Sequence, residues 1–402
     1  MDRTRRDITL LFSGRIVRLF AYGGLSVILA LYLEAVGLGG GTIGLLFTLT
    51  LAGDAGISLW ITTAADRIGR RRMLLLGAAL MVLAGAVFVL TGDPVLLMIA
   101  AIVGVISPSG NEIGPFLSLE QAALAQLIPK ERRTGTFAWY NLAGSLAGAA
   151  GALAGGFLSR GLQQLGLSAL QSYRAVLWGY AACGVAIAVL YLLLSAGVEA
   201  EAASSPSPRV LGLHASKGVV FRLSALFSLD AFAGGLVIQS MVAYWFHIRF
   251  GADEAMLGAI FFGANILAGV SALLAARIAA RIGLVNTMVF THVPSNILLI
   301  LVPLMPDLGW AIAMLLLRFS ISQMDVPSRQ SYTMAVVAPD ERAAASGVTA
   351  IARSIGASLS PVLGGVLIAD PLLASAPFFI AGGLKIVYDL LLYRSFRKAD
   401  VS

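Results

Sequence analysis

Long apolar segments separated by short charged breaks run the length of the chain. Five of them contain no Asp, Glu, Lys or Arg: residues 73–92, 134–159, 175–198, 255–276 and 282–306. A helix needs about 20 apolar residues to cross about 30 Å of hydrocarbon. The strands of a membrane barrel would instead alternate in polarity over about ten residues. Because these segments are apolar on every side, each is predicted to span a membrane as a helix.

Seven further segments have the same length and character but carry isolated charges. They cover residues 8–33, 42–65, 94–128, 219–247, 308–337, 343–369 and 376–393. The pattern therefore predicts an all-α membrane protein with twelve transmembrane helices.

Composition excludes most other classes of protein. Of the 402 residues, 58% are hydrophobic and 12% charged, whereas about a quarter of a soluble domain is charged. A soluble enzyme and a disordered scaffold are both excluded. The single cysteine, Cys183, cannot form an intramolecular disulfide. The three histidines lack metal-ligand spacing, so we expect no metal site and no cofactor.

The basic residues are distributed unevenly between alternate loops. If Met1 is cytoplasmic, the inner segments hold nineteen Lys and Arg, and the outer loops hold only Arg160, Arg174 and Arg249. This is the positive-inside bias, so both termini are expected in the cytoplasm and the protein in the cell (inner) membrane. The bias also accounts for the net charge of +7 without a nucleic acid partner.

An internal repeat divides the chain. The polar, Pro- and Ser-containing segment 197–218 is predicted to be a cytoplasmic linker between a half at 1–196 and a half at 219–402. A shift of 210 residues superimposes six identical pairs, which are Arg67 on Arg277, Arg71 on Arg281, Pro129 on Pro339, Glu131 on Glu341, Arg132 on Arg342 and Gly155 on Gly365. Two six-helix halves of the same orientation are therefore predicted.

The loop after the second span carries a family motif. It reads Asp66-Arg67-Ile68-Gly69-Arg70-Arg71 and resembles the G-x-L-a-D-R-x-G-R-R/K signature of the major facilitator superfamily, with Thr62 in place of the first Gly. With the twelve spans and the repeat, the whole chain resembles a secondary transporter of that superfamily, of the drug/proton antiporter kind. The resemblance implies that Asp66 and Arg70 latch onto the start of span eleven, near Arg342, when the outward-open state forms.

Span five is rich in glycine. Gly151 to Gly156 reads G-A-L-A-G-G, which resembles an antiporter signature ending G-P-x-x-G-G, except that Ala152 replaces the Pro. Glycines at this spacing are also typical of close helix packing in lipid. Both interpretations stay open.

Twelve charged residues lie inside the predicted spans. An ionised group at mid-bilayer costs at least about 2.5 kcal/mol, so each should be paired or should face water. Eight lie in spans one, four, seven and ten, which line the central cavity if the resemblance holds. The twelve are Arg15, Arg18, Asp54, Glu112, Glu120, Asp230, Arg318, Asp325, Arg329, Arg353, Lys385 and Asp389.

Glu112 is the strongest single candidate among them. It lies between Pro108 and Pro115 in a stretch that also holds two glycines, which weakens the helix there. In the repeat, Asp325 occupies the place of Pro115. Our hypothesis gives Glu112 and Asp325 a proton or cation role, with Arg18 and Arg329 as counter-charges or anion contacts.

Five of the other charged residues have predicted roles as site candidates or as a structural pair. Asp230, Glu120 and Asp54 are further candidates for a proton or substrate site, and buried salt bridges that fix helix packing are the alternative for every member of the set. Lys385 and Asp389 are four residues apart, so they are expected to form a structural pair on one helix face.

These observations predict a secondary active transporter that moves a small solute by alternating access, through proton-coupled efflux. Uptake or facilitated transport of an organic anion is one alternative, favoured by the cavity arginines. A non-transporting membrane receptor or scaffold is the other. We expect a monomer in the lipid bilayer, with a small-molecule substrate and protons as its partners.

Overall fold

The computed structural model describes residues 3–111, 116–199, 216–338 and 341–396, without the side chains of residues 66, 130, 131, 134 and 343. Every regular element in these ranges is a helix. The first group of helices comprises α1 (Arg3–Ala35), α2 (Gly40–Ile68), α3 (Arg70–Leu90), α4 (Pro94–Val103), α5 (Phe116–Leu127), α6 (Lys130–Gln164), α7 (Ala169–Leu192) and the short η1 (Ala196–Val198).

The second group follows after residue 216. It comprises α8 (Lys217–Gly235), α9 (Gln239–Phe250), α10 (Glu254–Ile282), α11 (Leu284–Leu301), η2 (Val302–Leu304), α12 (Leu308–Phe319), α13 (Asp325–Val336), α14 (Arg342–Leu359), α15 (Pro361–Ala369) and α16 (Ala376–Phe396).

Ten helical stretches of the described chain are long and apolar enough to cross a membrane. The predicted fourth and tenth spans are not continuous helices, because α4 and α12 end early at Val103 and Phe319. Gly104 is extended after α4, and Gly110 has a φ of +68°, which favours glycine. The breaks therefore lie in the stretch where two prolines and two glycines were expected to weaken the helix, and at the corresponding place in the second group.

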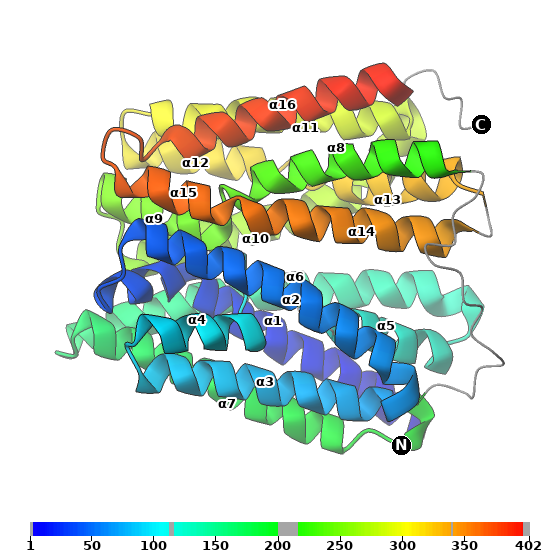
Figure 1. The fold of residues 1–402 in the computed structure, drawn as a ribbon, viewed down its shortest axis with the longest axis horizontal. Coiled ribbons are helices and arrows are strands. Elements are labelled where there is room, and N and C mark those ends of the chain that lie inside the picture. The colour runs from blue at the N-terminus through cyan, green and yellow to red at the C-terminus, as the bar shows by residue number, and fades with distance from the viewer. Residues whose placement is uncertain (1–2, 112–115, 200–215, 339–340, 397–402) are drawn as a thin grey trace.

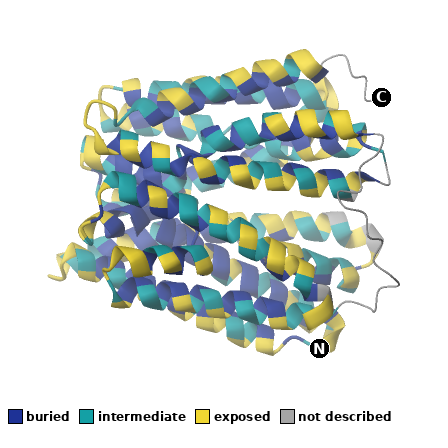
Figure 2. Ribbon diagram, viewed as in Figure 1, coloured by how far each residue is buried: buried dark blue, intermediate teal, exposed yellow. Residues whose placement is uncertain are grey.

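The helices run roughly side by side, with both ends of the described chain at one end of the bundle (Figure 1). We call this the terminal end and the opposite one the distal end. Buried positions gather where helices face one another, and exposed positions cover the outside (Figure 2). Many exposed side chains are large and apolar, for example Leu90, Trp139 and Leu372. Lipid tails solvate such a surface, as the composition requires.

The first group packs on the second from the distal end to the middle of the bundle. Ser26 of α1 accepts a hydrogen bond from the Gln239 side chain at its Oγ (2.7 Å) and one from the Ser240 hydroxyl at its carbonyl (2.7 Å). The amide of Ser240 donates to the Pro108 carbonyl in the break between α4 and α5 (3.0 Å). The break between α4 and α5 in the first group therefore meets the break between α8 and α9 in the second group at this contact.

Glycines on α6 allow its backbone to touch α1. A side chain at Gly151 would overlap the Phe20 carbonyl, and one at Gly155 would approach the Gly24 carbonyl to 2.6 Å. Small residues at such positions let membrane helices pack through their backbones. The glycine run of span five therefore has a packing role inside the first group.

The same helix also docks on the second group through Gly156. A side chain there would overlap the Glu254 carbonyl and lie 2.9 Å from the Cα of Gly258, both on α10. Beside this contact the buried Glu254 carboxylate accepts hydrogen bonds from Tyr173 (2.6 Å) and Gln163 (2.8 Å). A carboxylate of the second group is thus held by two donors of the first.

Equivalent turns in the two groups correct the register of the repeat. Gly69 follows α2 with a φ of +107°, and Gly283 follows α10 with a φ of +85°. Arg67 and Arg281 each precede the turn glycine by two residues, so these turns correspond at a shift of 214 rather than 210. The difference of four residues is about one helical turn, so the pairing of Arg67 with Arg277 was wrong by one turn.

The contact at Gly156 leads to a testable expectation. We expect Gly156→Ala to lower the free energy of unfolding by about 1–3 kcal/mol, the usual effect of overpacking a core, because the added methyl group meets the α10 backbone. The matched control is Gly161→Ala in the same helix, where an added methyl group would have no heavy atom of a neighbouring element within 4 Å. The measurement is the melting temperature of each purified variant. Equal melting temperatures for Gly156→Ala and Gly161→Ala would contradict the described packing.

Candidate functional site

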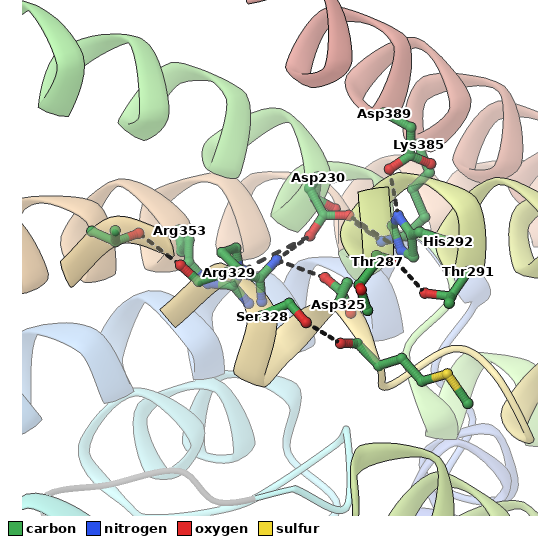
Figure 3. A network of polar contacts seen from close by, with 12 residues as sticks. Asp230, Thr287, Thr291, His292, Asp325, Ser328, Arg329, Arg353, Lys385 and Asp389 are labelled. Carbon is green, nitrogen blue, oxygen red and sulfur yellow. Dashed lines mark hydrogen bonds and ion pairs between the residues drawn. The ribbon is translucent and has the colours of Figure 1, made fainter. Parts of the chain in front are cut away.

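A network of charged side chains lies in the second group, centred on Asp230 of α8 (Figure 3). Lys385 of α16 places its Nζ 2.5 Å from Asp230 Oδ1, and Arg329 of α13 places Nη1 3.1 Å from Oδ2. Arg353 of α14 approaches Oδ2 to 3.8 Å with its Nη1. Because Asp230 is only 5% exposed, three cations from three helices converge on one buried carboxylate.

Arg329 is shared with a second carboxylate. The same Nη1 atom lies 3.1 Å from Asp325 Oδ2, four residues earlier on α13. Asp325 is the first residue of α13, because the helix is interrupted directly before it. A helix N-terminus stabilises negative charge, and the i,i+4 spacing places both side chains on one face. The break in the tenth predicted span therefore brings Asp325 to Arg329 and Asp230.

A histidine extends the network toward α11. His292 lies with its Nδ1 2.8 Å from Asp389 Oδ1 and its Nε2 4.0 Å from Asp230 Oδ1. Asn296, one turn further along α11, donates to Asp389 Oδ2 at 3.0 Å. His292 thus lies between two buried carboxylates on different helices.

These contacts correct the expected pairing of Lys385 with Asp389. The two residues share a face of α16, but Lys385 extends to Asp230 and Asp389 accepts from His292 and Asn296. Asp230 attracts the lysine because it offers a full negative charge in a buried place, while the two donors on α11 already satisfy Asp389. Span twelve therefore contributes to the network and is not peripheral.

His292 and Asn296 were not among the site candidates predicted from the sequence. A signal was present in span nine, where polar residues recur at helical spacing in an otherwise apolar segment. They are Thr287, Thr291, His292, Ser295 and Asn296. Such a polar stripe on a membrane helix faces protein or water rather than lipid.

The first group holds a separate buried ion pair. Arg18 of α1 donates to both oxygens of Glu120 on α5, at 3.0 and 2.6 Å, and both side chains are fully buried. Tyr191 and Tyr140 donate to the same carboxylate, Tyr191 at 2.5 Å. Each Glu120 oxygen therefore has two donors, and the Arg18 guanidinium also lies over the Phe116 ring.

Two site candidates, Asp54 and Glu112, have not yet been placed. Asp54 of α2 accepts from Ser58 at 3.3 Å. Glu112 lies outside the described residues, so its assigned proton role stays a prediction. The structure thus brings together Asp230, Asp325 and Arg329, and separately Arg18 and Glu120.

The loop with the family motif is bonded within the first group. The Arg70 guanidinium donates to Gln126 (2.9 Å) and to the Val198 carbonyl (3.4 Å), and the Glu199 carboxylate accepts from the Arg70 amide (2.6 Å). Arg71 reaches the Leu192 carbonyl.

The expected latch and its loop also include Arg342, Arg67 and Asp66. The guanidinium of Arg342 donates its Nε proton to the Met334 carbonyl at 2.9 Å. Arg67 is exposed, and the Asp66 side chain lies outside the described part of the chain. The expected latch to span eleven stays a prediction.

Comparisons with known proteins agree with this architecture. The model of the Major Facilitator Superfamily matches residues 11–361. The uncharacterized membrane protein YJR124C of Saccharomyces cerevisiae is 32% identical over 98% of this chain and 95% of its own length.

Three solved structures share the fold at low identity. The nucleoside transporter NupG has a TM-score of 0.75 at 14% identity over 99% of this chain and 100% of its own. A bacterial homolog of the human lysosomal transporter Spinster, in an inward-facing conformation, has 0.72 at 16%, over 98% and 96%. A D-xylose-proton symporter has 0.71 at 15%, over 96% and 97%.

The corrected pairing of Lys385 can be measured by double-mutant cycles. We expect Lys385→Met and Asp230→Asn to be coupled by about 1–3 kcal/mol, as for neighbours in one ion-pair network. The cycle of Lys385→Met with Asp389→Asn should show a smaller coupling, because Asp389 is hydrogen-bonded to His292 and Asn296 instead. Chemical unfolding of the purified variants supplies the energies, and a larger coupling to Asp389 would refute the pairing seen here.

Removing one partner of the Arg18–Glu120 pair should be more damaging than removing both. We expect Arg18→Met to cost about 3–5 kcal/mol, because it leaves a buried carboxylate without its counter-charge. The double variant Arg18→Met/Glu120→Leu should regain most of that loss. Thermal unfolding measures all three proteins, and a double variant less stable than Arg18→Met would show that the pair stabilises the fold directly.

Proposed function

The chain belongs to the Major Facilitator Superfamily, and on this premise we propose that it is a secondary active transporter that exports a small solute in exchange for protons. Its membership and its helical fold make it a multi-pass membrane transporter and not an enzyme. The proton coupling and the direction are our proposal. The sharing of Arg329 between Asp230 and Asp325 is the observation that carries it.

A shared cation makes the two carboxylates interdependent. Each Asp has an ionic contact with Arg329, and that contact loses its ionic component when the carboxylate binds a proton. If Asp325 is protonated, Arg329 interacts with Asp230 alone. If Asp230 is protonated, the contacts of α8 with Arg329 and Lys385 lose their ionic component. Proton binding therefore changes which helices are held together.

The network joins three helices of the second group, one of which follows an interruption of the chain. Asp230 lies on α8, Arg329 on α13 after an interrupted helix, and Lys385 on α16. Interrupted membrane helices in corresponding places of two repeats are typical of transporter binding sites. Proton uptake at this point can therefore be linked to the opening and closing of the bundle.

The proposal includes the arrangement of the whole chain. We infer that α4 with α5, and α12 with α13, each make one interrupted crossing, which gives twelve crossings. Residues 1–196 and 219–402 would then be two six-helix halves that rock about the midplane, joined by the linker 197–218. The positive-inside bias supports a cytoplasmic terminal end in the cell membrane, and we expect the transporter to work as a monomer.

Fewer observations support export than support proton coupling. It rests on the likeness of the glycine run in span five to an antiporter signature, and Gly156 of this run docks on α10 at the distal end. This packing keeps the two groups together at the distal end and fits a protein that loads its solute from the terminal end. If the protein were a receptor or a scaffold, the buried ionic network would have no assigned function.

Proteoliposomes test this function. The purified chain is reconstituted with a pH-sensitive dye inside and given an imposed pH gradient, and sugars, nucleosides, amines and carboxylates are added in turn. We expect at least one solute to move against proton flow. Asp325→Asn and Asp230→Asn should each lower solute-dependent proton flux at least tenfold, because an amide cannot exchange a proton.

The control for this experiment is Asp253→Asn, a partly exposed position at the start of α10 where the amide can still cap the helix. It should keep the wild-type flux. Solute movement that ignores the pH gradient, and that persists in Asp325→Asn, would rule out the coupling.

A further inference from the structure

The charged network in the described part of the second group holds more cations than carboxylates. Four cationic side chains, Arg318, Arg329, Arg353 and Lys385, lie in its membrane helices, and Asp389 is hydrogen-bonded to His292 and Asn296 instead. Asp230, Asp325 and Asp389 therefore supply three negative charges against four positive ones. Because uncompensated charge is expensive inside a membrane, each surplus cation should face water or a negatively charged ligand.

Arg353 is only weakly paired. Its Nη1 atom is buried and has no hydrogen-bond partner among the described residues, since Asp230 Oδ2 lies 3.8 Å away and Arg329 and Lys385 lie closer to that carboxylate. The Arg353 side chain is nevertheless 37% exposed, compared with 7% for Asp230 and Arg329. Arg353 therefore forms the accessible edge of the network.

The position of Arg353 on its helix indicates that this exposure is not toward lipid. Ile351, Ile355 and Leu359 are exposed and form one apolar stripe along α14. At about 100° per residue, Arg353 lies nearly opposite the middle of that stripe. The neighbouring Gly356 packs directly on Ser228 of α8. The guanidinium therefore points into the bundle.

Arg318 supplies a second unmatched charge near the same carboxylates. Its Nε atom is buried without a hydrogen-bond partner, and among the described residues no carboxylate lies within ion-pair distance of it. It follows the buried Leu315 by three residues on α12, so it shares the inward face of that helix. Asp230 and Asp325 act on it electrostatically from a longer distance.

We propose that Arg353, assisted by the positive field of Arg318, binds the charged group of an organic anion, a carboxylate or a phosphate. This inference rests on the proposed transport function and names the class of solute. A guanidinium with free N–H groups binds such groups through charge-assisted hydrogen bonds. The bound anion would compete with Asp230 for the cations around it.

Binding is measured without transport, on the purified full-length chain in detergent at constant ionic strength. The probes are benzoate, octanoate and phenyl phosphate, with benzamide and benzylamine as the neutral and cationic counterparts. A ligand that binds the folded state raises the melting temperature, and more so the tighter it binds. We expect at least one anion to do so and neither counterpart to do so. The carboxylates and phenyl phosphate show which anionic group is preferred.

Variants locate the site. We expect Arg353→Gln to weaken anion binding at least tenfold, Arg353→Lys to keep part of it, and Arg318→Gln to weaken it less than Arg353→Gln. Arg249→Gln, an exposed arginine at the end of α9, is the matched control and should leave binding unchanged. Size-exclusion profiles show whether each variant is folded.

The outcome separates this inference from the proposed function. Anions that stabilise no better than benzamide, or that bind Arg353→Gln as tightly as the wild type, would overturn the inference while proton-coupled flux of another solute could stand. Arg353-dependent anion binding without any proton flux would support the site and refute proton-coupled transport.

Discussion

Buried charge is the constraint on which the rest of this structure depends. A membrane helix bundle can be assembled from apolar segments alone. An ionised side chain inside it loses its hydration, so it must contact a partner or water to offset that loss. The two groups of helices meet this requirement differently. Glu120 has two donors on each oxygen, from Arg18, Tyr191 and Tyr140. Asp230 instead lies among cations that compete for it.

Close backbone packing is what allows the groups to meet at all. Without a hydrophobic driving force between helices in lipid, association depends on van der Waals contact and interhelical hydrogen bonds. Gly156 brings α6 against the α10 backbone, and Glu254 is then within reach of Tyr173 and Gln163. The glycines therefore set the distance at which the polar contacts of the distal end can form.

Much of the fold could be predicted from the sequence because lipid imposes a strong pattern on it. Segment length, hydropathy and loop charge indicated the membrane spans, and the expectation that Arg329 serves as a counter-charge agrees with its contact to Asp325 in the structure. The link from Lys385 to Asp230 could not be predicted, since the two residues are 155 positions apart and only the packing of α16 on α8 brings them together. Local spacing favoured Asp389, and a neighbour on another helix proved the better partner.

The contrast between the two ionic clusters explains why the second group is the better place for a switch. Protonating Glu120 would leave Arg18 buried without its counter-charge and would disturb two tyrosine donors as well. Around Asp230, a proton removes one negative charge from a network in which Arg329 can interact with Asp325 instead, at the same 3.1 Å. A network with an alternative partner for its cation can rearrange when one carboxylate binds a proton, and the proposed transport cycle needs such an element.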